Sequence, residues 1–174
     1  LNPKNSVLLN NMGFAYGEMG RLNEAISCYQ RSIALDSEDL VTRLNLASAY
    51  ERLKKTDLAM KEYEAAYKLD PQNSEILQPL SQIYLDSKKY EKSIPLLQAL
   101  IKQRPEDAVL YNNLGYAYTE TGRLKQAAES YEKSVQFDPS DPTGYINLAR
   151  VYERMDRLEN AVENYSEALK KNPN

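Results

Sequence analysis

The sequence contains no histidine and no tryptophan, and it has one cysteine, Cys28. Without histidine, these 174 residues cannot form a Ser-His or Cys-His nucleophile pair or a histidine metal site. A single cysteine cannot close an internal disulfide, so the redox compartment stays undetermined. Abundant Asp and Glu do not by themselves exclude a carboxylate mechanism. Even so, these absences predict a protein that is not an enzyme and needs no metal or cofactor.

Long apolar runs and an excess of basic charge are missing as well. No run approaches the roughly 20 apolar residues that span a bilayer, and no charged start leads into an apolar block and a cleavage site. The 22 basic and 25 acidic residues give a formal net charge of −3, and bases alternate with acids. Phosphate recognition needs clustered Lys and Arg. We therefore expect neither membrane insertion nor nucleic-acid binding.

What the sequence does contain is one pattern that returns five times at a period of 34 residues without an insertion. The stretch at 110–134 nearly restates the stretch at 8–32, three periods earlier. Each period holds a tyrosine in register: Tyr16, Tyr50, Tyr84, Tyr118 and Tyr152. A small residue precedes each tyrosine, and a second small residue and a large one follow it. Spacings of three, four and seven within each half predict two helices for each period.

Helix boundary signals follow the same period. An Asn or Asp stands before each predicted first helix, where its side chain can cap free N–H groups; these residues are Asn5, Asp39, Asn73, Asp107 and Asp141. A proline recurs after each predicted second helix except the first. Because proline has no backbone N–H, it would end the helix there. The prolines are Pro71, Pro105, Pro139 and Pro173. Pro142 suits a first helical position.

The pattern Leu-Gly-x-x-Tyr, then Ala, then an aromatic residue, then Pro, at 34 residues, resembles the tetratricopeptide repeat family. The resemblance covers essentially the whole chain and implies an all-α fold, a right-handed superhelical solenoid of antiparallel helix pairs. We expect one domain over 1–174, with 1–5 as the tail of a preceding repeat and the chain as an excerpt of a longer array. The repeats are 6–39, 40–73, 74–107, 108–141 and 142–174.

In this family the first helices line the concave groove, so the resemblance directs attention to their exposed positions. One of these positions holds asparagine in four repeats: Asn11, Asn45, Asn113 and Asn147. A row of amides can hydrogen-bond an extended peptide backbone without reading its sequence. Because asparagine is common at this position in the family, the row can equally mark ancestry.

Two further groups complete the predicted groove. Phe14 and Tyr116 take equivalent positions in their repeats. Each ring could form part of a pocket for a ligand side chain, or it could pack against a neighbouring helix. Arg150 and Arg154 lie one turn apart, where an acidic side chain or a terminal carboxylate could dock. The alternative for the arginines is ion pairing with Glu153. The clamp with which co-chaperone members hold a chaperone tail is not expected, since few of its positions match.

The third repeat differs from the others because it carries Pro79 in its first helix and Pro95 in its second. Each proline removes one backbone hydrogen bond and favours a bend. The hypotheses are a hinge, a local change of curvature, or a kink that neighbouring packing absorbs.

Taken together, these observations favour a protein–protein interaction scaffold that binds a peptide or a partner helix in its concave groove. One alternative is the substrate-selecting arm of a larger enzyme such as a glycosyltransferase. Another is a structural scaffold that self-associates through its end repeats or its groove.

Overall fold

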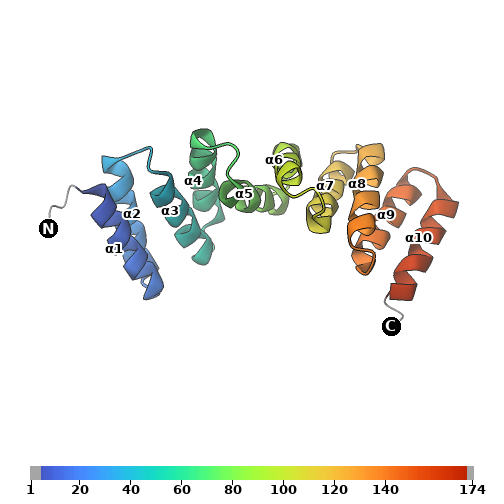
Figure 1. The fold of residues 1–174 in the computed structure, drawn as a ribbon, viewed down its shortest axis with the longest axis horizontal. Helices are drawn as coiled ribbons and strands as arrows, with labels where there is room; N and C mark the ends of the chain where they lie inside the picture. Colours follow the sequence, from blue (N-terminus) through green and yellow to red (C-terminus); the bar gives the residue numbers. More distant parts are fainter. Residues whose placement is uncertain (1–4, 172–174) are drawn as a thin grey trace. The chain divides into compact units, whose positions relative to one another are not determined.

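The computed structural model describes residues 5–171, and these residues form ten helices and no strand (Figure 1). The helices are α1 (Ser6–Glu18), α2 (Leu22–Leu35), α3 (Leu40–Arg52), α4 (Thr56–Leu69), α5 (Ser74–Asp86), α6 (Tyr90–Gln103), α7 (Ala108–Glu120), α8 (Leu124–Phe137), α9 (Pro142–Arg154) and α10 (Leu158–Lys171). The all-α prediction is confirmed. The tail assigned to 1–4 and the position of Pro173 lie outside the described residues.

The predicted caps are present at the start of every first helix. The Asn5 side chain accepts hydrogen bonds from the N–H groups of Val7 and Leu8, and Asn73 accepts from Glu75 at 2.9 Å. Asp39, Asp107 and Asp141 cap α3, α7 and α9 in the same way. Each cap satisfies backbone donors that have no partner within the helix. The Asx residues therefore set where each first helix begins.

The turn inside each helix pair requires one residue in the left-handed region. Gly20 and Gly122 have φ angles of 75° and 76°, which glycine adopts without steric cost. Lys54, Lys88 and Asp156 take the equivalent positions with φ angles of 56° to 58°. The tight turn is thus a property of the repeat, and three repeats form it with a side chain that disfavours it.

The helices of a pair approach closely where a small residue meets an aromatic ring. An ideal Cβ built on Gly13 would lie 2.5 Å from Cε1 of Tyr29, and one on Gly115 would lie 2.8 Å from Cε1 of Tyr131. Both tyrosines are buried. Glycine at these two positions lets the ring lie directly against the backbone of the first helix, as the pattern of small residue and tyrosine predicts.

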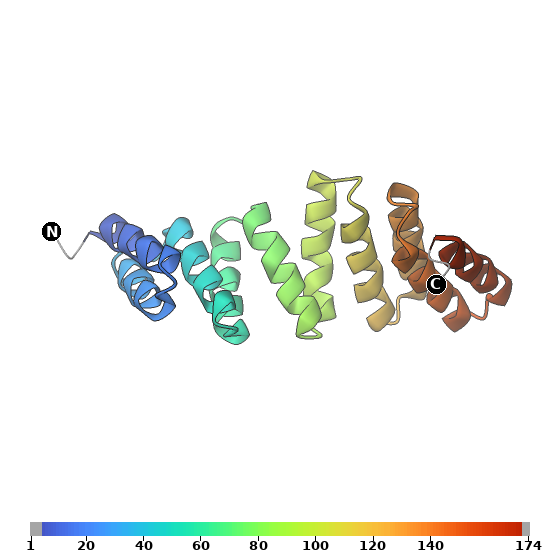
Figure 2. The same cartoon turned by 90° about the horizontal axis from the view of Figure 1, so that it is seen from below.

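The chain divides into two compact units, which meet between Ile83 and Tyr84 inside α5. In the first unit α2 packs against both α1 and α3, and in the second α8 packs against both α7 and α9 (Figure 2). In these repeats the second helix thus covers both its own first helix and the next one. Pro79 and Pro95 lie inside α5 and α6, and both elements continue as single helices; the hinge stays a hypothesis.

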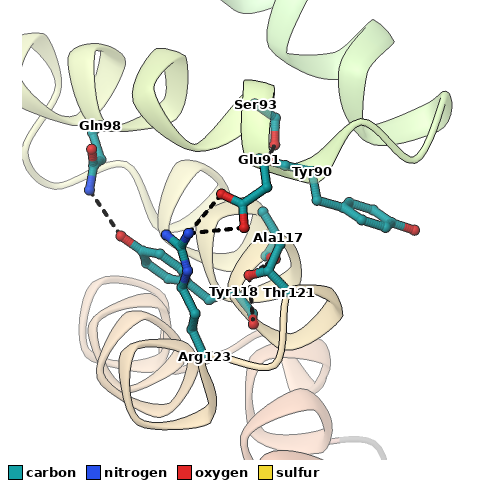
Figure 3. Close-up of polar contacts among 8 residues, drawn as sticks. All are labelled: Tyr90, Glu91, Ser93, Gln98, Ala117, Tyr118, Thr121 and Arg123. Atoms are coloured by element: carbon teal, nitrogen blue, oxygen red, sulfur yellow. Dashed lines mark hydrogen bonds and ion pairs between the residues drawn. The ribbon is translucent and has the colours of Figure 1, made fainter.

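Hydrogen bonds between successive repeats explain the tyrosine register. Nε2 of Gln98 in α6 donates to the Tyr118 hydroxyl in α7 at 2.9 Å (Figure 3). Gln30 donates to Tyr50 at the same distance, and the Tyr152 hydroxyl donates to the Glu132 carboxylate at 2.6 Å. The repeated tyrosine therefore joins its first helix to the second helix of the preceding repeat.

A charged contact joins α6 to the turn between α7 and α8. Arg123 donates to both carboxylate oxygens of Glu91, at 2.9 and 2.7 Å (Figure 3). Both side chains are exposed, so solvent screening leaves this pair a modest contribution to stability. The buried surface and the tyrosine contacts carry most of the stacking.

The contact between Gly13 and Tyr29 makes Gly13→Ala destabilising. The new methyl group would overlap a buried ring that cannot move freely, so we expect the free energy of unfolding to fall by about 1–3 kcal/mol. Gly17→Ala is the matched control in the same helix, because its Cβ would meet ordinary contacts of 3.7 and 3.8 Å. Alanine there should stabilise the helix by roughly 0.5–1 kcal/mol. Denaturant unfolding measures both, and equal effects would contradict the close-contact account.

Candidate functional site

A hollow of about 90 Å³ lies inside the first unit, between α1 and α3, which are the first helices of repeats one and two. Its lining residues are Phe14, Gly17, Glu18, Leu22, Tyr29, Asn45, Ser48, Ala49 and Arg52. Two of the predicted groove residues, Phe14 and Asn45, therefore share one site. The sequence analysis did not place Gly17, Ser48 or Arg52 at it as binding residues.

Helical spacing explains how these side chains converge. Phe14 and Glu18 are four residues apart on α1, and Asn45, Ser48 and Arg52 are three and four apart on α3, so each set shares one helix face. Because Gly17 has no side chain, the space in front of the Tyr29 hydroxyl and the Arg52 guanidinium stays open.

The asparagine row divides into two kinds of residue. Nδ2 of Asn45 donates to Oδ1 of Asn10 in the preceding first helix at 2.9 Å, and Asn147 donates to Asn112 at 3.0 Å. Asn11 and Asn113 make no side-chain hydrogen bond with the part of the chain that the structure describes. Half of the row thus links consecutive first helices, and the other half keeps its amide groups available.

Two arginines bridge consecutive first helices one turn further along. Nη1 of Arg52 donates to the Gly17 carbonyl at 3.0 Å, and Nη1 of Arg154 donates to the Thr119 carbonyl at 3.1 Å. These carbonyls lie in the last turns of α1 and α7, where helix oxygens lack internal partners and attract a positive charge. Arg154 therefore has a structural contact that the sequence analysis did not foresee.

Glu153 does not form the ion pair that the sequence analysis weighed for the two arginines of α9. It accepts a hydrogen bond from the Tyr165 hydroxyl at 2.9 Å. Among residues 5–171, neither Arg150 nor Arg154 has a carboxylate within ion-pair distance. Their charges are therefore not neutralised by a neighbouring acid.

The positions that line the hollow have counterparts in the second unit, on α7, α8 and α9. Four positions differ, and the residue is larger in the second unit at each: Gly17 becomes Thr119, Phe14 becomes Tyr116, Ser48 becomes Arg150, and Ala49 becomes Val151. The duplicated site thus carries bulkier side chains and an additional arginine in the second unit.

The two predicted aromatic residues have different surroundings. Phe14 is 56% exposed at the edge of the hollow. The Tyr116 ring meets the Tyr90 ring edge-on at a centroid distance of 5.5 Å, and the two hydroxyls are 3.2 Å apart. Tyr116 therefore packs on the start of α6, whereas Phe14 keeps its ring available to a ligand.

The phenols at the base of the two sites remain neutral donors at neutral pH. Burial raises the pKa of Tyr131 to about 12, although a hydrogen bond with Thr119 opposes this shift. Burial also raises the pKa of Tyr29, and it raises that of Tyr63 together with a hydrogen bond to Glu51. The sites thus offer phenol, amide and guanidinium donors beside the Glu18 and Glu120 carboxylates.

Other chemistry finds little support in the described residues. No group of three or more Cys, Asp or Glu side chains in residues 5–171 could hold a metal ion. Cys28 is buried in α2. No described helix is long and apolar enough to cross a membrane.

A larger depression of about 530 Å³ lies between α7 and α8, and nothing in the sequence signalled it. Its lining residues are Tyr111, Leu114, Tyr118, Gln126, Glu129, Ser130, Glu132, Lys133 and Gln136. The Tyr118 and Glu132 side chains that face it already hold hydrogen bonds to neighbouring repeats. The hollow between α1 and α3, which contains two of the predicted groove residues, is therefore the stronger candidate.

Family models match the chain along its length. The TPR repeat model matches residues 115–156, and models of the tetratricopeptide repeat match residues 5–72, 53–115 and 142–174. The chain belongs to the tetratricopeptide repeat family. No match was found among curated proteins. Scaffold proteins of this family are generally without enzymatic activity, and the family supports an interaction role for this chain.

Solved structures share the fold. YrrB, described as a TPR protein with an unusual peptide-binding site, is 18% identical with a TM-score of 0.88, over 99% of this chain and 89% of that one. A crystal structure of MamA is 23% identical with a TM-score of 0.83, over 97% and 92%. A MamA structure from Desulfovibrio magneticus RS-1 is 22% identical with a TM-score of 0.79, over 97% and 95%. These likenesses confirm an all-α TPR solenoid.

The Asn10–Asn45 hydrogen bond should couple the two residues energetically. Asn45→Ala leaves the half-buried Asn10 amide without its partner, so a double-mutant cycle should give a coupling of about 0.5–1.5 kcal/mol. Asn11→Ala is the control, because Asn11 has no such bond; we expect a change within roughly 0.5 kcal/mol. Denaturant unfolding of the parent, Asn10→Ala, Asn45→Ala and the double variant measures the coupling. A value near zero would remove the structural role of Asn45.

The buried Tyr131 phenol should make stability fall in alkaline solution. Its pKa is about 12 in the folded chain and about 10 in an unfolded chain. Below pH 10 both states keep the proton. As the pH rises from 10 towards 12, the unfolded chain loses it first, so the free energy of unfolding falls, by about 1 kcal/mol at pH 11. Tyr131→Phe should show a smaller fall between pH 9 and 11, measured by denaturant unfolding. Equal falls would contradict the burial effect.

Proposed function

We propose that this chain is a non-catalytic scaffold whose first-helix groove holds a peptide segment of a partner protein in extended form. The observation that carries the proposal is the hollow between α1 and α3. It brings together an exposed ring, an amide, a carboxylate and a guanidinium without an enclosed reaction pocket. Grooves that bind peptides use this combination of polar groups for the backbone and an apolar site for a side chain.

The charged groups of the hollow favour a ligand that has both donors and acceptors. Glu18 lies on α1 and Arg52 on α3, and neither has an ion-pair partner among residues 5–171. A peptide backbone offers N–H groups to the carboxylate and carbonyls to the remaining guanidinium donors. A bound peptide would satisfy both walls at once.

The open amides extend this recognition along the array. Asn11 and Asn113 retain all their donors and acceptors, and Asn45 and Asn147 retain an acceptor and one N–H after their structural bonds. In the second unit, Arg150 and Arg154 beside Asn147 favour an acidic residue of the ligand. YrrB, which shares this fold and is described as having an unusual peptide-binding site, adds support.

The test compares capture of partner proteins by the parent chain and by two variants. The groove variant combines Asn11→Ala, Phe14→Ala and Asn113→Ala, none of which removes a side-chain hydrogen bond of the described structure. The control variant combines Lys61→Ala and Lys125→Ala, which are exposed on the second helices α4 and α8 and line neither hollow. All three chains must first show the same helical signal and melting.

The expected result is a partner that binds the parent and the control equally and the groove variant at least about tenfold more weakly, a loss of about 1.4 kcal/mol. Titration with peptides cut from the captured partner then shows whether a linear segment suffices. If the groove variant binds as tightly as the parent, or the control loses binding as well, the groove is not the binding surface.

A further inference from the structure

The depression between α7 and α8 is a second candidate site, separate from the first-helix groove. Its volume of about 530 Å³ lies within the range of ligand pockets. Tyr111, Leu114 and Tyr118 line it from one face of α7, and by helical spacing Asn113 and Glu120 lie on the opposite face. A ligand in this hollow would therefore contact a surface that the proposed groove does not use.

In the second repeat, an ion pair bridges the two helices at the equivalent positions. Arg43 in α3 and Glu62 in α4 take the repeat positions of Tyr111 and Ser130. Nη1 of Arg43 lies 3.0 Å from Oε2 of Glu62, and its other two guanidinium nitrogens donate to the Ser37 carbonyl at 3.0 and 2.8 Å. Both side chains of the pair are largely buried. In the first repeat, two buried residues, Leu9 and Cys28, hold these positions.

In the fourth repeat no side chain makes such a bridge. The Tyr111 ring stacks on Phe137 at the end of α8, with ring centroids 5.5 Å apart. Ser130 is short, and its hydroxyl donates to the Gln126 carbonyl of its own helix at 2.7 Å. Tyr111 and Ser130 both line the hollow. The hollow therefore lies at the positions where the second repeat holds a guanidinium between its two helices.

The charged groups that line the hollow favour a cation. The Glu129 carboxylate has no ion pair or hydrogen bond among residues 5–171. Glu132 accepts from the Tyr152 hydroxyl with Oε1 and retains Oε2 as an acceptor. Lys133 is the basic residue of the lining, and its ammonium donates to Oε1 of Gln136 at 3.0 Å. The lining thus carries two carboxylates and one ammonium group.

The arginine beside the hollow is already engaged. The Arg123 guanidinium lies 5.9 Å from the centre of the Tyr118 ring and donates to both carboxylate oxygens of Glu91 (Figure 3). Its charge is therefore balanced, and it leaves the Glu129 carboxylate available to a ligand.

We propose that this hollow binds an arginine side chain of a partner protein. The guanidinium would take the place that Arg43 takes in the second repeat, with Glu129 as its carboxylate partner and the Tyr111 ring beside it. Arginine suits the hollow better than lysine, because a planar guanidinium with five donors can pair with a carboxylate and lie on an aromatic ring at once. Arginine is also among the residues that most often anchor protein interfaces.

The test uses N-acetyl-arginine amide as the probe and NMR of the 174-residue chain as the readout. We expect saturable shifts of the Tyr111 and Ser130 backbone amides, with a dissociation constant on the order of 1–10 mM for a single side chain. N-acetyl-citrulline amide has nearly the same shape without the charge. It should bind at least about threefold more weakly, because its hydrogen bonds to a carboxylate are not between opposite charges.

Variants of the chain locate the site. Glu129→Gln should weaken binding of the arginine probe by roughly two- to fivefold, the effect of one exposed ion pair. Glu163→Gln is the matched control, because it removes the same charge at the same repeat position in α10 and should leave the affinity unchanged. Tyr111→Arg combined with Ser130→Glu introduces the ion pair of the second repeat into the hollow, and it should abolish binding of the probe.

Equal melting temperatures show that each variant folds, and Glu129→Gln decides if the double variant does not. The proposal is wrong if the arginine probe shifts neither amide or if the citrulline probe binds equally well. It is also wrong if Glu129→Gln binds as tightly as the parent, or if Glu163→Gln weakens binding to the same extent.

Discussion

The rest of the structure depends on the need of each helix pair to bury an apolar face that it cannot cover alone. The Tyr29 ring lies directly on Gly13, and this contact draws the two helices of the first repeat together. The outer side of α2 then covers α3, so the next pair is placed by the same packing. In a repeat array, stability therefore comes from contacts within each helix pair and between neighbouring pairs.

The candidate site follows from this stacking. Consecutive first helices lie close enough for Asn45 to bond Asn10 and for Arg52 to reach the Gly17 carbonyl. These bonds fix the spacing of the two walls, and the missing side chain of Gly17 leaves room between them. The second unit repeats both bonds and has Thr119 in place of Gly17. One duplicated framework thus presents different side chains in the two units, an exposed phenylalanine ring in the first and two arginines in the second.

The same physical rule accounts for the exposed faces of α1 and α10. A face that is buried at every internal junction stays exposed where no further described helix packs on it. Val162 in α10 is 64% exposed, whereas Ala128, at the same repeat position in α8, is 5% exposed. These two faces are aliphatic, whereas the groove carries mixed polar groups that suit a peptide backbone.

The sequence by itself determined the helix pairs, their caps and the family, because capping, turns and helical spacing are local and recur every 34 residues. Asn5 and Tyr16 could be assigned from their positions in the pattern alone. Only the tertiary structure decided which groove residues are free. Asn45 and Asn11 are identical in sequence terms, yet one bonds across to the neighbouring helix and the other does not. That difference depends on contacts between residues 35 positions apart, which no local pattern records. For the same reason Arg154, predicted as a ligand group, proved to hold a helix end as well.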